Sequence, residues 1–180
     1  TAEEAEDALQ AEDEQDIWND VETAVRGCAE RFVETRVAEG EKLKNDLLMK
    51  LDGILDMVAR IEERSPQIVA EYRKKLEGKV AELLGDTKID EAVLATELTI
   101  FADKICVDEE TVRLRAHVQN MQETLNAGEN IGRKLDFIAQ EMNREANTTL
   151  SKANDMDISN IAINLKTEIE KIREQIQNIE

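Results

Sequence analysis

Residues 132–155 form the stretch GRKLDFIAQEMNREANTTLSKAND, which predicts an amphipathic α-helix over about 131–149. Its apolar residues recur at helical spacing and predict a buried stripe: Leu135, Ile138, Met142 and Ala146. The opposite face carries Arg, Asp, Gln and Asn. Asparagine is a poor helix former, and it occurs at positions 143, 147 and 154. We infer that something other than helix stability selected these side chains.

The flanking segments also show helical periodicity. Residues 108–125 have an apolar stripe, and Asn126-Ala127-Gly128 is expected to end that helix. A last helix begins near 157–159, and its 3–4 alternation favours coiled-coil-like packing: Ile161, Leu165, Ile169, Ile172, Ile176 and Ile179. Residues 89–104 predict another helix, although the Thr-rich run TELTIF is also compatible with an extended segment. The strand signal is weak throughout the chain.

The first half of the chain predicts long helices. From Ile17 to about Glu63 the apolar residues follow helical spacing, with a break near Gly40 left open. Ser65-Pro66 suits an N-cap followed by a first helical position, so we expect a second helix over 66–84. The short connection predicts an antiparallel hairpin. The fold class is therefore all-α, a long helical hairpin plus a C-terminal helical bundle.

Composition supports this class and defines three expected regions. Of the 180 residues, 41% are hydrophobic but only 3% aromatic, with one Pro and seven Gly, which is typical of aliphatic helical proteins. The net charge is −18, so the average surface repels nucleic acid and anionic membranes. Acidic residues are dense in 1–16, which predicts a solvated linker. The expected regions are this linker (1–16), the long helical hairpin (17–86) and a C-terminal helical region (87–180).

Cellular context follows from what the chain contains. Cys28 and Cys106 lie far apart without CxxC spacing, so we expect reduced thiols in a cytoplasmic protein. No apolar run reaches transmembrane length, and no signal peptide is visible, so no membrane partner is expected. The chain starts at Thr1 within an acidic run, which we interpret as a fragment or a processed product.

Two carboxylates on the 131–149 helix are candidate metal ligands. Glu141 and Glu145 are one turn apart near the apolar stripe, where they repel each other unless a cation lies between them. Oxygen ligands suit Mg²⁺ or Mn²⁺. The structural alternative is that each Glu pairs with Arg or Lys of a neighbouring helix. Arg133 and Arg144 flank the polar face that holds Asn143 and Asn147.

A second cluster is expected on the 108–125 helix. Glu110, Arg113 and His117, the only histidine, form a stripe beside its apolar residues. In phosphodiester chemistry, a His moves a proton, an Arg holds the phosphate and a Glu orients the His or binds metal. The alternative is a His at the edge of the core with a hydrogen-bond partner. Lys152 is placed to meet phosphate, and Asp155 to cap the next helix.

Several familiar signatures are absent from the sequence. It has no Gly-rich phosphate loop, no GxSxG, no HExxH and no CxxC pair. Aromatic residues are too few for the stacking platforms of RRM or OB domains.

Three ordered blocks resemble a known family. FADKICVDEETVRLRAHV, the 132–155 stretch and the terminal EIEKIREQIQNIE are similar to the C-terminal part of the YicC/YloC endoribonucleases. The likeness is dense over 100–180 and weaker over 16–84. Cys106 stands where the family commonly has Asp, and Leu150 where it has Gly. These departures put a ligand role at 106 in doubt and suggest a differently shaped loop after Thr149.

The resemblance implies a cytoplasmic, metal-dependent enzyme that cuts RNA internally as a ring-like homo-oligomer of six subunits, with 87–180 as its catalytic or RNA-binding region. It also implies a missing strand-rich N-terminal domain, which would make the whole protein α+β. It does not assign roles, so the assignment of residues is our own inference. We predict catalytic residues His117, Glu141, Glu145 and Arg144; RNA-binding residues Arg113, Arg133, Asn143, Asn147 and Lys152; and Mn²⁺ or Mg²⁺ ligands Glu110, Glu141 and Glu145.

Two further interpretations remain open. The chain is also compatible with a non-catalytic helical scaffold that binds RNA, a regulatory RNA or a partner ribonuclease, because its long apolar stripes require partner helices. A purely structural coiled-coil protein explains the apolar stripes but not the Arg/Asn/Gln face. Metal-dependent cleavage of a labelled RNA separates the enzyme from both.

Overall fold

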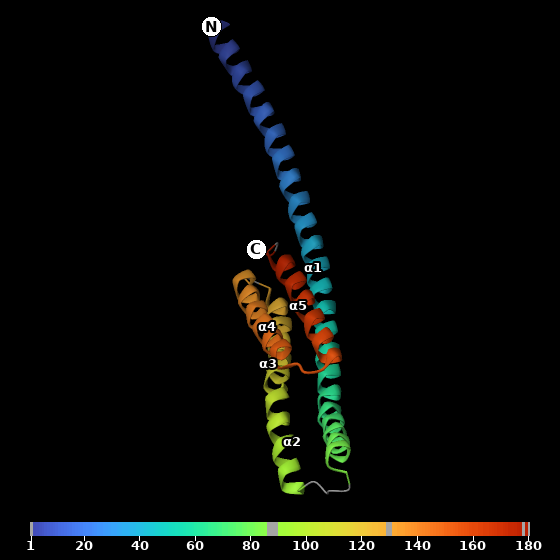
Figure 1. Cartoon of the computed structure of the whole chain (residues 1–180). Helices are drawn as coiled ribbons and strands as arrows, with labels where there is room; N and C mark the ends of the chain where they lie inside the picture. Colours follow the sequence, from blue (N-terminus) through green and yellow to red (C-terminus); the bar gives the residue numbers. More distant parts are fainter. Residues whose placement is uncertain (1, 86–89, 129–130, 178, 180) are drawn as a thin grey trace. The chain divides into compact units, whose positions relative to one another are not determined.

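The part of the chain described by a computed structural model forms five α-helices (Figure 1). The structure describes residues 2–85, 90–128, 131–177 and 179, with the side chains of 2–14 and 84 left out of the description. No strand occurs among these residues, which confirms the all-α class, and the TELTIF run is helical. The helices are α1 (Ala2–Leu84), α2 (Glu91–Ile105), α3 (Asp108–Ala127), α4 (Gly132–Lys152) and α5 (Met156–Ile176).

Helix α1 continues through the expected boundary at Pro66. The prediction of a chain reversal at Ser65-Pro66 is therefore wrong. Proline lacks the N–H that would bond to the carbonyl of Glu62, but the loss is local. The Ser65 hydroxyl donates to the carbonyl of Ile61 at 2.8 Å, which satisfies a neighbouring acceptor in the same turn. Gly40 does not break the helix either.

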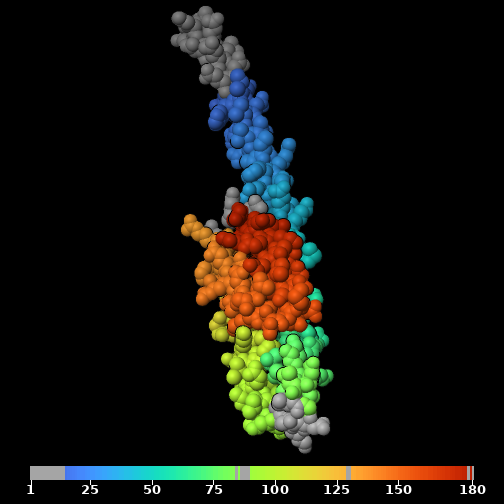
Figure 2. All heavy atoms as spheres, in the orientation of Figure 1, coloured from blue at the N-terminus to red at the C-terminus, as the bar shows by residue number. Residues whose placement is uncertain are grey.

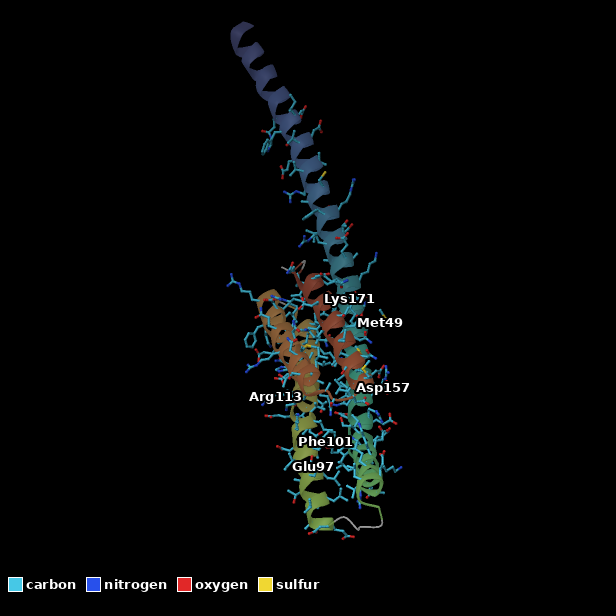
Figure 3. The ribbon with its side chains drawn as sticks, in the orientation of Figure 1. Met49, Glu97, Phe101, Arg113, Asp157 and Lys171 are labelled. Atoms are coloured by element: carbon cyan, nitrogen blue, oxygen red, sulfur yellow. The ribbon has the colours of Figure 1, made fainter. Side chains whose placement is uncertain are left out.

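The chain reverses between α1 and α2 instead, so the hairpin exists with its turn about twenty residues later than expected. Tyr72 of α1 stacks on Phe101 of α2 with ring centroids 3.7 Å apart, and its hydroxyl lies 3.3 Å from Glu97 (Figure 3). Asp90 caps α2 by accepting from the N–H of Ala92. The expected start at Ile89 lies outside the described residues.

Part of α1 joins α3, α4 and α5 in a four-helix bundle. Helix α4 runs antiparallel to α3, and α5 runs antiparallel to α4, so the short connections place these neighbours side by side. The sequence did not show which helix covers the apolar stripe of α1. In the structure this stripe is fully buried: Leu47, Leu51, Ile54, Val58 and Ile61. The predicted stripes of α3, α4 and α5 face it, including Leu114, Leu135, Met142, Leu165 and Ile169 at 0% exposure. Aliphatic burial on this scale is the main stabilising contribution to the unit.

Polar contacts fix how the bundle helices align. Arg115 of α3 binds Glu62 of α1 through two hydrogen bonds of 3.0 and 2.7 Å. Arg64 of α1 donates a hydrogen bond of 2.8 Å to Asp155. Asp155 also caps α5, as predicted, because its side chain accepts from the backbone N–H groups of Asp157 and Ile158. Hydrogen bonding to Arg64 lowers the pKa of Asp155. One carboxylate therefore starts α5 and joins it to α1.

The structure divides the chain differently from the predicted regions. It forms two compact units, Thr1–Lys44 and Asn45–Glu180. The bundle thus begins at Asn45 rather than at 87, because the 47–61 stripe of α1 completes its core. The expected linker at 1–16 is helical from Ala2. In the first unit, apolar side chains remain exposed along the helix: Ile17, Trp18, Val21, Val25, Phe32, Val33 and Val37.

Two simpler expectations can also be compared with the structure. Cys28 and Cys106 are both free and exposed thiols. Among the described residues, no helix is both long and apolar enough to cross a bilayer.

Candidate active site and nucleic-acid interface

The contact between α3 and α4 gathers most of the charged residues singled out in the sequence. Glu110, near the N-terminal end of α3, is only 3% exposed. Lys152, at the end of α4, donates to its Oε1 atom at 2.8 Å, and this hydrogen bond raises the pKa of Lys152. The other oxygen, Oε2, is buried and has no hydrogen-bond partner among the described residues. A buried carboxylate oxygen without a partner is costly, so this atom is a natural acceptor for a further donor or a cation.

One turn further along α3, Arg113 contacts the second buried carboxylate. Glu145 is 4% exposed, and its Oε1 lies 3.5 Å from Nη1 of Arg113. Arg113 also pairs with Glu109 on its own helix and is half-exposed on the bundle surface (Figure 3). The arginine therefore connects the buried acid to solvent, where a phosphate group could approach it.

The same alignment positions His117 and Glu141. Helices α3 and α4 are antiparallel, and the pairs 110–152 and 113–145 fix their register. One further turn on each helix brings residue 117 level with residue 141. His117 is half-buried and forms no hydrogen bond or ion pair with another residue in the described part of the chain. Its imidazole is thus available beside a carboxylate.

Each of the three predicted metal ligands is paired with a cation, but the alternative of pairing with a neighbouring helix holds for Glu145 and not for Glu141. Glu110 pairs with Lys152 and Glu145 with Arg113, both across helices, whereas Glu141 pairs with Arg144 on its own helix at 3.7 Å. Among the described residues, no group of three or more His, Cys, Asp or Glu side chains is arranged to hold a metal. Their oxygens are the hard donors that Mn²⁺ and Mg²⁺ prefer, but a bound ion would need water or substrate oxygens as well.

The solvent-facing ridge of α4 holds a second group of predicted residues. Arg133, Arg144 and Asn147 are exposed on the side opposite the buried stripe. Arg144 is 75% exposed and has only its long contact with Glu141. Phe137, which sequence reasoning did not select, is 62% exposed on the same ridge. Its position on the helical wheel, away from Leu135 and Ile138, was the signal that could have identified it.

Asn143 lies elsewhere, on the contact between α4 and α5. Its side-chain amide donates to Glu170 at 2.6 Å, and nearby Arg173 donates to Asp136 at 2.9 Å. Figure 2 shows α4 and α5 side by side on one face of the bundle. The predicted polar face of α4 is therefore divided: Asn143 and Asp136 bind α5, whereas Arg133, Arg144 and Asn147 face solvent. The structure does not bring Asn143 together with His117 and Glu145.

Fold and site together define an all-α bundle with an acid–base cluster between two antiparallel helices. Residues 61–180 match the family profile described as endoribonuclease YicC-like, C-terminal. The chain belongs to this family.

Two curated relatives support the same conclusion. The chain is 44% identical over 170 residues to a probable endoribonuclease YicC of Clostridioides difficile, covering 94% of this chain and 58% of the relative. It is 36% identical over 171 residues to a probable endoribonuclease YicC of Haemophilus influenzae, covering 95% and 59%. The chain thus spans less than two thirds of the length of these relatives.

Proposed function

We propose that the protein is an endoribonuclease that uses the α3–α4 cluster to hydrolyse RNA phosphodiester bonds with the help of Mn²⁺ or Mg²⁺. The observation that carries the proposal is the line of Glu110, Arg113 and His117 aligned with Lys152, Glu145 and Glu141 across two helices. It combines buried carboxylates, cations that reach solvent and one unpaired imidazole. The names of the relatives support RNA as the substrate.

Each side chain has a role that its surroundings allow. Arg113 and Lys152 would hold the phosphate, because both already bind carboxylates and extend toward solvent. The predicted ligands Glu110, Glu141 and Glu145 are not gathered into one metal cluster among the described residues, so a divalent cation would be held by part of this set, for example the unpartnered Oε2 of Glu110, together with water and phosphate oxygens. When bound, the cation neutralises charge on the phosphate and lowers the pKa of a coordinated water.

His117 would handle the proton transfer. In hydrolysis, an oxygen of water bonds to phosphorus while the bond to the leaving ribose oxygen breaks, and that oxygen must gain a proton. An imidazole can both accept and donate a proton, which suits this transfer. Arg144 and Arg133, on the outer ridge of α4, would hold the flanking RNA backbone, which the acidic bulk of the protein repels.

The test uses the whole protein and three variants. Glu145→Gln and His117→Ala should each lower the rate of metal-dependent cleavage of a labelled single-stranded RNA by about 10²–10³. Glu170→Gln is the control, because Glu170 accepts a hydrogen bond across the α4–α5 contact instead. Cleavage at the wild-type rate by both site variants would refute the site. RNA retention without any new ends, with or without Mn²⁺, would favour the scaffold instead.

Assembly is the second component of the proposal. The exposed apolar side chains of 17–37 require a partner, since a lone helix cannot bury them. We assign this partner to further copies of the protein in a ring-like oligomer acting in the cytoplasm. Light scattering on the whole protein tests the assembly, and a strict monomer at micromolar concentration would contradict it.

A further inference from the structure

The exposed ring of Phe137 lies among cations on the outer ridge of α4. At 100° per residue, Arg133, Phe137, Gln140 and Arg144 fall within a sector of about 60° that faces directly away from the buried stripe of the helix. Phe137 is 62% exposed, and the other three are exposed as well. A large aromatic side chain in this position does not contribute to the core of the bundle.

The charges around the ring favour a polyanion. Arg133 and Lys134 form no hydrogen bond or ion pair with another described residue. Among the described residues, Arg144 has one ion pair, at 3.7 Å with Glu141. The carboxylate of Asp136, the residue before Phe137, accepts hydrogen bonds from Arg173 and Gln140. In a chain with a net charge of −18, this ridge offers unneutralised cations beside a flat apolar surface.

We infer that Phe137 stacks on an unpaired base and that the ridge of α4 selects single-stranded RNA over duplex. Arginine side chains on either side bind the phosphates that flank the stacked base. Base–aromatic stacking requires an unstacked base, which a duplex does not offer. A single ring is not a stacking platform, so it orders one nucleotide rather than a long strand. This inference rests on the proposed action on RNA.

The experiment compares RNA binding by the whole protein and its variants in EDTA, so that metal-dependent cleavage is suppressed. The probes are a fluorescent single-stranded oligoribonucleotide, the same sequence paired as a duplex, and a single strand with one 2-aminopurine. Phe137→Ala and Phe137→Leu should both weaken single-strand binding about 5- to 100-fold and leave duplex binding unchanged. Phe137→Trp should retain the affinity and the 2-aminopurine response. Met49→Ala is the matched control, since Met49 is 66% exposed on α1 and lies outside the α4 ridge and outside the 17–37 segment.

Arginine variants provide a second, independent readout. Arg133→Gln should weaken single-strand and duplex binding alike. Because one phosphate contact is lost, the slope of log binding constant against log salt concentration should fall in magnitude by about one. If the unmodified protein binds RNA and Phe137→Ala binds the single strand equally well, Phe137 does not stack on a base. That result would overturn this inference and leave the proposed function standing. Absence of RNA binding by the unmodified protein would refute the proposed function itself. A fall in oligomer mass for Phe137→Ala but not Phe137→Leu would make the ring a protein interface and overturn the inference.

Discussion

The ammonium group of Lys152 lies 2.8 Å from the Oε1 atom of Glu110, although 42 positions separate the two residues in sequence. The contact joins the C-terminal end of α4 to the N-terminal end of α3. It therefore fixes the antiparallel register of the two helices, and that register aligns Arg113 with Glu145 and His117 with Glu141.

The energy of this pair can be measured with a double-mutant cycle. Lys152→Met should lower the free energy of unfolding by about 1–3 kcal/mol, because it leaves the buried carboxylate of Glu110 without a cation. The double variant Lys152→Met/Glu110→Gln should recover part of this loss. The pair Lys171–Glu168 on the surface of α5 is the control, with an expected coupling of at most about 0.5 kcal/mol. Equal coupling energies in urea unfolding would contradict the buried role.

Asp155 should make the stability of the bundle depend on acid pH. Its hydrogen bond with Arg64 lowers its pKa in the folded state. The stabilisation is therefore present above the ordinary pKa of 3.8 and is lost as the pH falls through the folded value. Asp155→Asn keeps the cap but loses the charge, so it should be less stable than wild type at pH 7, with the difference shrinking below about pH 4.

Asp155→Ala separates the cap from the ion pair. It should cost about 1 kcal/mol more than Asp155→Asn at every pH, because no side-chain oxygen then accepts from Asp157 and Ile158. Urea unfolding at pH 7 and pH 3 measures both effects. A constant difference between wild type and Asp155→Asn across this range would exclude the ion pair as a stabilising contact.

Pro66 tests the continuity of α1. Pro66→Ala restores an N–H that can bond to the carbonyl of Glu62, so it should raise the free energy of unfolding by about 1–2 kcal/mol. Ser65→Ala is the neighbouring control and removes only the hydroxyl bond to Ile61. Destabilisation by Pro66→Ala would instead indicate that the chain turns at this position.

Gly132 tests a close backbone approach at the start of α4. A Cβ atom there would lie 2.8 Å from the carbonyl oxygen of Ile179, so Gly132→Ala should destabilise the bundle by about 1–3 kcal/mol. Gly53→Ala, in the interior of α1 with open space around it, should stabilise by about 0.5–1 kcal/mol. Thermal unfolding of the two variants should therefore shift in opposite directions.

Local sequence signals were enough to predict most of the helices and their buried faces. Apolar residues at 3–4 spacing identified the stripes of α3, α4 and α5, and Asp155 and Gly128 were recognised as helix boundaries. These are local properties, because periodicity and capping act within a few turns. The Ser65-Pro66 boundary failed for the same reason. A proline is compatible with a helix start, and packing of the 47–61 stripe against other helices outweighed its local cost.

Which polar residues meet depends on how the helices pack. The helical wheel placed Asn143 on the polar face of α4, Arg144 beside that face and Glu145 closer to the apolar stripe. The neighbouring helices then divided that face: α3 buries Glu145 against Arg113, α5 binds Asn143 through Glu170, and Arg144 stays in solvent. Spacing along one helix carries no information about which helix packs on each side. That arrangement depends on contacts between residues far apart in the chain, such as Glu110 with Lys152 and Arg64 with Asp155.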